Sequence, residues 1–223
     1  MLGARARAND RIEVDGRPVR LRTAGAPARV LLYNKPVGEL VTRSDPGGRP
    51  TVFQRLPRLR DGQWVAVGRL DLNTSGLLLF TDSGELANRL MHPRYQIERE
   101  YLVRVLGRLS EATRRRLLRG VMLEDGEAAF ALLERQGDEA GDAANHWYRA
   151  VLREGRTREV RRLFEAVGLR VSRLMRVRFG ALRLPRNLQP GRWTELEQNR
   201  CAALLARTAV EGAPEVVPVS KSC

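Results

Sequence analysis

Short apolar runs separated by polar, glycine-containing loops characterise the first part of the chain. Segments 30–33 (Val-Leu-Leu-Tyr), 64–67 (Trp-Val-Ala-Val) and 77–80 (Leu-Leu-Leu-Phe) follow this pattern. Apolar runs of this length bounded by turn residues are typical of buried strands. We therefore predict three buried strands here, with a Pro- and Gly-rich loop over residues 43–50.

The second part of the chain contains further strand patterns. Residues 101–106 form an alternating strand, and residues 121–136 and 146–153 predict two more. An acidic, Gly- and Ala-rich loop joins the last two. Residues 171–184 are predicted to be largely extended and carry several arginines.

Two helices are predicted between these strands. Asp82 and Glu85 have the spacing of a capping box, so we expect a helix to begin at Asp82 and to stop near residues 92–93. A second, basic helix is expected over residues 110–119, with Gly120 as its C-cap.

A third helix is predicted after Thr157, which can cap its first turn. Its apolar positions, Val160, Leu163, Phe164 and Val167, fall on one helical face. Helices are thus interspersed with strands, while several neighbouring strands are joined by short polar loops. This order favours an α+β domain with a mixed, largely antiparallel sheet and flanking helices over a doubly wound parallel sheet.

Charge narrows the choice of partner. The 223 residues include 40 Lys+Arg and 26 Asp+Glu, a formal net charge of +14 at pH 7. Nucleic acid is the commonest partner of such a surface, because each neutralised phosphate releases counterions. A thermophilic or high-GC source whose codon usage favours arginine would give the same composition, so both explanations stay open at this stage.

Other classes of protein are disfavoured by the sequence. No run of about 18 apolar residues predicts a membrane span. The two cysteines, Cys201 and Cys223, suggest no disulfide framework. His92 and His146 lack companions at metal-ligand spacing, so we predict no metal site. We expect a cytoplasmic protein without a membrane partner.

Asp71 is the sharpest candidate for chemistry. It lies in a short loop, residues 68–76, which begins and ends with glycine and separates two apolar strands. A carboxylate held between hydrophobic runs needs a partner or a chemical task. The alternative is that Asp71 only braces the loop through backbone N–H groups, as turn aspartates often do.

A family resemblance gives this aspartate a role. Residues 68–81 (G-R-L-D-L-N-T-S-G-L-L-L-F-T) resemble the signature of the RsuA-type pseudouridine synthases, in which G-R-L-D precedes x-x-T-x-G-L-L-L-x-T. Further matching segments follow in the same order, at residues 34–36, 85–93, 99–105 and 154–163. The likeness extends from residue 29 to about 197, and it implies the pseudouridine synthase fold.

Two shorter segments point to a subgroup. Residues 47–53 and 165–168 are similar to the members of this family that act on the large ribosomal subunit. The resemblance therefore implies isomerisation of a uridine in large-subunit (23S) ribosomal RNA to pseudouridine, with ribosomal RNA as the partner and the protein acting as a monomer.

The resemblance also implies individual roles. Asp71 corresponds to the nucleophile, and Tyr101 to the tyrosine that lies against the target base and assists proton removal at C5. Arg161 is the best match to the arginine that pairs with the aspartate, and Arg156 is the second choice. By pattern alone Tyr101 would be a core or sheet-face residue, and Arg161 a solvated or phosphate-facing charge.

The chemistry agrees with these roles. The product is an isomer, so no metal, redox cofactor or ATP is required. A carboxylate can act on the ring or on the ribose, and if it is buried it stays ionised only beside a cation. A flipped uridine needs a flat partner to replace its lost stacking.

Several arginines are candidates for RNA contact, namely Arg69, Arg156, Arg158, Arg173 and Arg176. Arg69 could equally brace the Asp71 loop. The run at residues 114–116 is as well explained by a solvated helix face as by RNA contact. Three tryptophans, Trp64, Trp147 and Trp193, lie in or near apolar strands and are predicted to be core residues.

The resemblance also divides the chain. Members of the family begin with an S4 RNA-binding domain, and here only residues 9–16 resemble its closing part. We expect residues 1–28 to be a remnant of that domain plus a linker, 29–197 the catalytic domain, and 198–223 a helix and a loose tail. Two rival functions fit the same charge and fold: a non-catalytic ribosomal RNA-binding or assembly factor, and an RNA-cleaving enzyme with Asp71 as general base. The Asp71, Tyr101 and Arg161 set disfavours the first, and the missing histidine pair or metal cluster disfavours the second.

Overall fold

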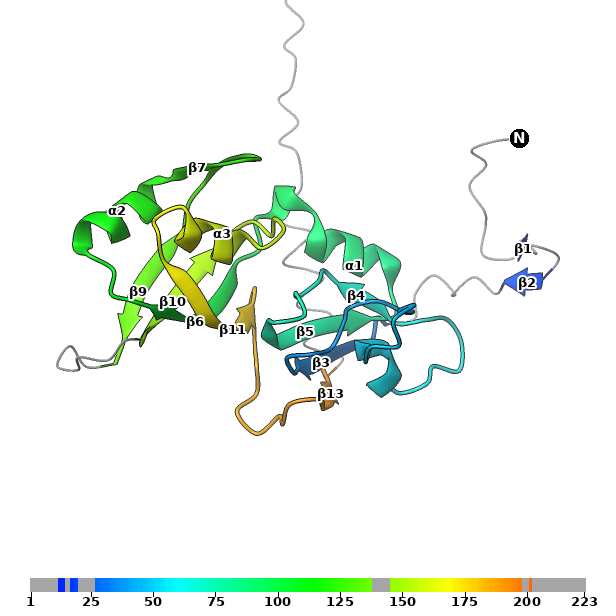
Figure 1. Cartoon of the computed structure of the whole chain (residues 1–223). Helices are drawn as coiled ribbons and strands as arrows, with labels where there is room; N and C mark the ends of the chain where they lie inside the picture. The colour runs from blue at the N-terminus through cyan, green and yellow to red at the C-terminus, as the bar shows by residue number, and fades with distance from the viewer. Residues whose placement is uncertain (1–11, 15–16, 20–26, 138–144, 198–200, 202–223) are drawn as a thin grey trace, which may run out of the picture.

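The computed structural model describes residues 12–14, 17–19, 27–137, 145–197 and 201 (Figure 1). A large mixed sheet runs through the molecule. In spatial order its strands are β13 (Trp193–Glu195), β3 (Val30–Lys35), β5 (Ser75–Thr81), β11 (Arg170–Phe179), β6 (Arg99–Leu106), β10 (Asn145–Leu152) and β9 (Leu132–Gln136). Two short strands, β4 (Val65–Val67) and β12 (Leu182–Arg183), pair with β5 and β11.

The predicted α+β class is confirmed. Among the described residues every strand pair is antiparallel except β5 with β11. The helices are α1 (Gly84–Met91), α2 (Glu111–Arg119) and α3 (Glu159–Glu165), with single 3-10 turns at Val52–Arg55 and Pro93–Tyr95. Figure 1 shows α1 over one half of the sheet, and α2 and α3 over the other.

The half of the sheet built on β3 and β5 is covered on both faces. Leu77 and Leu79 of β5 pack with Leu86 and Leu90 of α1 in one core cluster. The alternate side chains of β5, including Phe80, pack with Trp64 and Val52 in a second cluster on the opposite face. Burial of both faces explains why these strands are continuous apolar runs.

The other half is covered on one face only. In β6, Val103 and Val105 are buried in a core cluster with Leu117 of α2 and Phe164 of α3, whereas Leu106 is exposed. This arrangement requires alternation of apolar and polar side chains, and β6 shows it. Among the described residues no helix covers the opposite face of this half of the sheet.

The two halves meet at a short seam. On one edge β5 pairs with β4 and with β11, and its pairing with β11 comprises only Ser75 with Met175 and Gly76 with Arg176. Gly76 has φ +100°, and a Cβ there would lie 2.2 Å from the carbonyl oxygen of Arg176. Only glycine allows the two strands to approach this closely.

Two helix starts differ from the prediction. The N-cap of α1 is Ser83, whose hydroxyl accepts a hydrogen bond from the Leu86 amide, whereas Asp82 instead accepts one from the Arg29 amide. Thr157 caps nothing: the N-cap of α3 is Arg158 in the left-handed region at φ 53°, without a side-chain cap. The predicted apolar face of α3 and the Ser110 start and Gly120 end of α2 are confirmed.

Residues 121–136 form three strands rather than one. A hairpin of β7 (Val121–Leu123) and β8 (Gly126–Ala128) precedes β9 and forms its own two-stranded sheet. The two-residue turn is Glu124-Asp125, and Gly126, at φ +113°, follows it as the first residue of β8. An Asp-Gly pair such as Asp125-Gly126 is a sequence signal for a tight hairpin, because glycine readily adopts positive φ.

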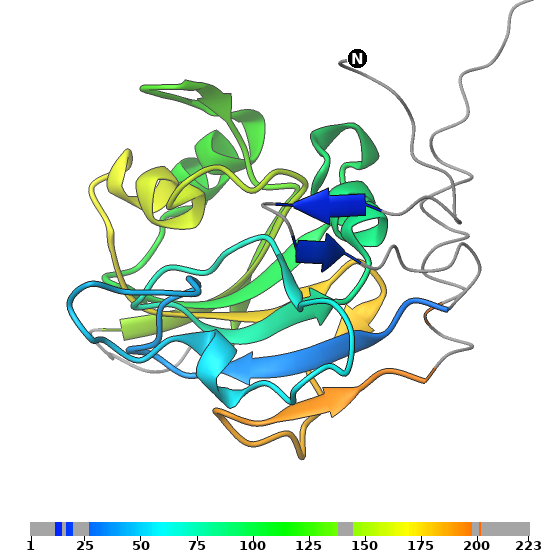
Figure 2. The ribbon, with the colours of Figure 1, turned by 90° about the vertical axis from the view of Figure 1, so that its right-hand side faces the viewer.

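The predictions at the two ends of the chain are only partly covered by the described residues. Residues 12–14 and 17–19 form a small hairpin, β1 (Ile12–Val14) and β2 (Arg17–Val19), separate from the large sheet (Figure 2). The prediction for 198–223 falls outside the described residues, apart from the buried Cys201. None of the described helices is long and apolar enough to cross a membrane.

Two of the three tryptophans are not core residues. Trp64 is buried, as predicted, but Trp147 and Trp193 are each 37% exposed. Trp147 lies on the uncovered face of β10, where the alternation of the strand directs it outward.

Candidate active site

Asp71 lies in the loop that enters β5. Its backbone carbonyl accepts a hydrogen bond from the Thr74 amide at 3.0 Å, which closes a tight turn. Leu70 packs into the core cluster beneath β5, so the loop is anchored on the side preceding Asp71. The Asp71 side chain is half-buried.

Lys35, at the end of β3, holds this turn in place. Its ammonium is fully buried and donates to the carbonyl oxygens of Pro36 at 3.0 Å, Asp71 at 3.1 Å and Thr74 at 2.9 Å. Burial lowers the pKa of Lys35 from 10.5 to about 8, although the charges of Glu39 and Asp71 oppose this change. The lysine is therefore a backbone clamp and a positive charge close to the carboxylate of Asp71.

Replacement of this lysine should weaken the fold. In Lys35→Met the buried carbonyls lose their donor, and we expect the free energy of unfolding to fall by about 2 kcal/mol. Urea titration followed by circular dichroism measures this change. The matched control is Arg108→Met, which removes an exposed basic side chain and should change stability by less than about 0.5 kcal/mol. Equal stability of the two variants would show that the clamp is not needed.

Asp71 opens into a large cleft of about 890 Å³ between the two halves of the sheet. Its walls include hydrophobic, aromatic and basic side chains. Among the residues that line it are Arg69, Asp71, Arg99, Tyr101, Arg156, Arg158, Glu159, Leu174, Arg176 and Phe179. The volume suits a small organic ligand such as one nucleotide.

Tyr101 and Arg176 are neighbours in the wall of this cleft. They are direct partners in the pairing of β6 with β11, so their side chains share one face. Arg176 is 3% exposed and donates from Nε to the Leu77 carbonyl oxygen at 2.7 Å. Burial lowers the pKa of Arg176, and the hydroxyl of Tyr101 opposes this shift. Arg176 is thus a buried part of the wall, placed beside the phenol rather than on an open surface.

Arg161 projects from α3 toward the Asp71 loop. Its guanidinium donates to the carbonyl oxygens of Asn73 and Val171, each at 3.0 Å. Burial and the charge of Arg158 lower its pKa, while the carboxylate of Asp71 raises it. Within the described residues no carboxylate oxygen lies within 4.0 Å of Arg161, so it meets Asp71 as a nearby charge and as a support for its loop rather than as a direct ion pair.

The alternative pairing of Arg156 with Asp71 has less support. Arg156 lies 2.7 Å from Glu154 and 3.7 Å from Asp125, so carboxylates outside the Asp71 loop already neutralise it. Arg158 lies at the start of α3, 3.7 Å from Glu165.

The other RNA-contact candidates separate in space. Arg69, beside Asp71, is exposed at the cleft. Arg173 is also exposed but does not line the cleft, because it belongs to the opposite face of β11 from Leu174 and Arg176. Residues 114–116 lie on α2, away from the cleft, and Arg114 and Arg115 form ion pairs with Glu111.

Two further cleft residues were not singled out from the sequence. Arg99 is buried, donates to the carbonyl oxygens of Ile97 and Arg153, and lies 5.3 Å from the ring of Phe179. Glu159 is buried and accepts a hydrogen bond from the Arg156 amide at 3.0 Å, and burial raises its pKa. Both residues lie within segments that match the family's motifs, 99–105 and 154–163, and this match could have identified them from the sequence.

This arrangement can bind a planar, anionic ligand. It offers the half-buried carboxylate of Asp71, the phenol of Tyr101 and the buried guanidinium group of Arg176. Within the described residues, no carboxylate forms a direct ion pair with this guanidinium group. No cluster of three His, Cys, Asp or Glu side chains suited to a metal is found in the described part of the chain.

Comparisons with known proteins find matches over most of the chain. The family described as RNA pseudouridylate synthase matches residues 29–166. The chain is 57% identical over 198 residues to Ribosomal large subunit pseudouridine synthase B of Pseudomonas aeruginosa, covering 88% of this chain and 51% of that protein. For the protein of the same name from Escherichia coli (strain K12), identity is 56% over 206 residues, covering 92% and 69%.

Solved structures give the same fold. A pseudouridylate synthase crystal structure matches with a TM-score of 0.71 at 26% identity, covering 90% of this chain and 83% of that one. A chain of an H/ACA RNP bound to a substrate RNA containing 2'-deoxyuridine matches with a TM-score of 0.51 at 17% identity, covering 73% and 50%, which indicates a shared fold only. The chain spans about half the length of the Pseudomonas aeruginosa relative and about two thirds of that from Escherichia coli.

Proposed function

Because the chain belongs to the RNA pseudouridylate synthase family, in its RsuA-type branch, we propose that it isomerises a specific uridine of large-subunit (23S) ribosomal RNA to pseudouridine. The observation that carries this proposal is the position of Asp71, half-buried in a nucleotide-sized cleft that Tyr101 also lines. No cofactor is needed, because substrate and product have the same atoms.

The reaction exchanges one glycosidic bond for another. The N1–C1′ bond breaks, the base turns, a C5–C1′ bond forms, C5 loses its proton and N1 gains one. The carboxylate of Asp71 assists by attack on the ring or ribose, or by removal of a ribose proton. The positive charges of Lys35 and Arg161 both interact electrostatically with this carboxylate.

Tyr101 has two tasks in this proposal. A uridine that leaves its helix loses stacking, and the ring of Tyr101 in the cleft wall offers a flat replacement. The hydroxyl lies beside Arg176 and can take part in removal of the C5 proton. The exposed Arg69 and the neighbouring Arg158 are placed to contact phosphates at the rim.

Further parts of the proposal concern context. Residues 9–16 are assigned to the closing part of an S4-type RNA-binding domain, and 29–197 to the catalytic domain. We place the protein in the cytoplasm, acting as a monomer on ribosomal RNA or its precursor.

The proposal is tested with unmodified large-subunit ribosomal RNA that carries tritium at uridine C5. Wild-type protein should release label to water in an amount equal to one uridine per RNA, and sequencing should locate one pseudouridine. RNA binding without release would instead indicate a non-catalytic RNA-binding factor. Strand cleavage would indicate a hydrolytic enzyme.

The hydroxyl of Tyr101 can be tested separately. In Tyr101→Phe the ring remains for stacking but proton transfer is impaired, so we expect kcat for tritium release to fall about 100-fold. The dissociation constant for the RNA should remain near the wild-type value. Tyr95→Phe, which removes a buried hydroxyl outside the cleft, is the matched control and should retain full turnover.

A further inference from the structure

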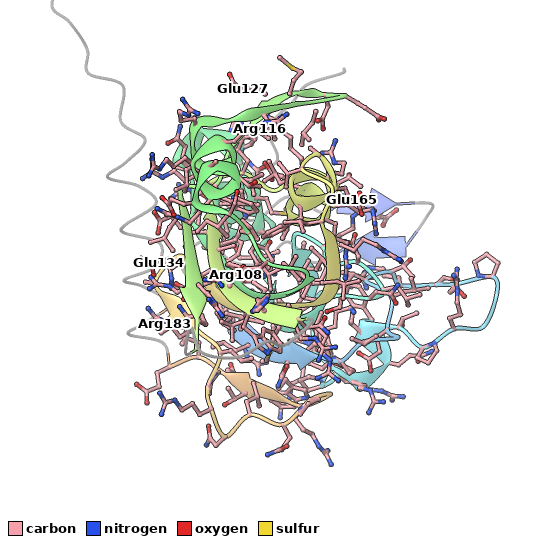
Figure 3. The ribbon with its side chains drawn as sticks, turned by 60° about the vertical axis from the view of Figure 1, so that its left-hand side comes forward. Arg108, Arg116, Glu127, Glu134, Glu165 and Arg183 are labelled. Atoms are coloured by element: carbon pink, nitrogen blue, oxygen red, sulfur yellow. The ribbon has the colours of Figure 1, made fainter. Side chains whose placement is uncertain are left out.

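The half of the sheet formed by β9, β10, β6 and β11 has an uncovered face. Figure 1 shows α2, α3 and the β7–β8 hairpin all on one side of these strands. In Figure 3, Arg116 and Glu127 lie on that helical side and Arg183 lies on the other. The buried side chains of these strands face the helices, so the alternate ones form what we call the outer sheet face.

The strand register shows which residues share this face. Arg173 pairs with Arg104, Arg104 with Trp147, and Trp147 with Gln136, giving one continuous row across the strands. The next row is Met175, Leu102, Arg149 and Glu134. Directly paired residues have side chains on the same face and a few ångströms apart. The outer sheet face is defined by these two rows together with Arg170, Leu106 and Asn145.

The positive charges of the first row are not neutralised locally. Arg104 donates to the hydroxyl of Ser172 at 3.0 Å, and neither Arg104 nor Arg173 has a carboxylate within 4.0 Å among the described residues. The carboxylates near this face are otherwise engaged: Arg149 lies 3.2 Å from both Glu100 and Glu134. Within the described residues, the row therefore carries two guanidinium groups without a carboxylate partner, of which Arg173 is exposed and Arg104 partly exposed.

Trp147 is the direct partner of Arg104, with Arg173 one strand further along the same row, and it is 37% exposed. A large aromatic side chain held rigidly on a sheet, with cations next to it, is the combination that binds unpaired nucleotides. The ring stacks on a base while the guanidinium groups contact phosphates.

We propose that the outer sheet face is a second RNA-contact surface, in which Trp147 stacks on an unpaired base and Arg104 and Arg173 bind the adjacent phosphates. The inference rests on the proposed function, since it assigns an additional contact with the same ribosomal RNA. A second copy of the chain fits this face less well, because two like-charged rows would meet across the interface and the apolar side chains, Leu102, Leu106 and Met175, are few.

Binding of an in vitro transcribed large-subunit ribosomal RNA tests this surface at several salt concentrations. We expect Trp147→Ala to raise Kd about tenfold and Trp147→Phe, which keeps a stacking ring, to restore most of the affinity. The double variant Arg104→Gln/Arg173→Gln should weaken binding and reduce the salt slope by about 1.4, the value for two phosphate contacts to a single strand. Trp147→Ala and the double variant should raise KM for tritium release, Trp147→Phe should change it little, and all three should leave kcat at saturating RNA unchanged.

The matched control is Arg116→Gln/Arg119→Gln, which removes the same charge from the exposed side of α2. It should bind RNA as the wild type does. The inference is overturned if the control and the outer-face variants lose equal affinity for RNA, or if neither loses any. It is also overturned if the wild type dimerises in sedimentation experiments without RNA and Trp147→Ala does not. Because Kd is measured without turnover, wild-type protein that binds RNA but releases no label would contradict the proposed function and leave this test intact.

Discussion

Replacement of the carboxylate at position 71 should abolish turnover and leave the protein folded and able to bind RNA. Asparagine has the same shape as aspartate, and the loop contacts with Lys35 and Thr74 use the backbone carbonyl, which Asp71→Asn retains. The amide is neither a nucleophile nor a base, so we expect kcat to fall by at least about 10⁴-fold, as for other reacting groups that have been removed. Tritium release under single-turnover conditions measures the loss.

The matched control is Asp61→Asn, an exposed aspartate outside the cleft, which should retain wild-type kcat. The RNA dissociation constant of both variants should stay within about threefold of wild type, because neither side chain is assigned a phosphate contact. Residual turnover of Asp71→Asn above one tenth of wild type would rule out the nucleophilic role.

Gly76→Ala should be the most destabilising single substitution considered. The new Cβ would lie 2.2 Å from the Arg176 carbonyl oxygen and 2.8 Å from its amide nitrogen, both backbone atoms that cannot move without separating β5 from β11. Positive φ adds strain of its own. We expect the free energy of unfolding to fall by about 4 kcal/mol or more, a loss associated with severe overpacking.

Gly62→Ala isolates the backbone contribution. Gly62 also has positive φ, +84°, but no heavy atom lies within 4 Å of the added Cβ. Its cost should therefore be about 1–2 kcal/mol. Urea titration of both variants measures the difference, and a similar loss in each would show that the strand contact is not limiting.

Much of the fold could be predicted from the sequence because the burial of each strand face determines the order of apolar and polar residues along the strand. The run at 77–80 is apolar throughout because β5 is covered on both faces, and β6 alternates because it is covered on one. The hairpin within 121–136 was missed because its strands are three residues long, too short for a periodic pattern, although Asp125-Gly126 carried the turn signal.

Helix starts were harder to predict because adjacent residues offer equivalent caps. Asp82 and Ser83 can each accept a backbone hydrogen bond, and the tertiary contact of Asp82 with the Arg29 amide leaves the cap to Ser83. Thr157 failed as a cap because Arg158 adopts left-handed backbone geometry.

The site was predictable only in part. Asp71 and Tyr101 line one cleft, as the motifs implied, but the support that Lys35 gives to the loop depends on a contact between β3 and a loop 36 residues away. Arg173 and Arg176 were grouped by charge, yet they belong to opposite faces of β11. The two residues are an odd number of positions apart, and this indicates opposite faces because successive side chains of a strand alternate between the two faces of the sheet.

The seam between β5 and β11 divides the proposed reacting groups between two structural units. Asp71 enters β5 on one side, whereas Tyr101 and Arg161 belong to the elements packed on the other. Neither unit holds all of these groups, so their separation depends on the contacts across the seam: the two residue pairs of β5 with β11 and the hydrogen bonds of Arg161 to Asn73 and of Arg176 to Leu77. A change that tilts one unit against the other would therefore alter the geometry of the proposed reaction without altering any residue that lines the cleft.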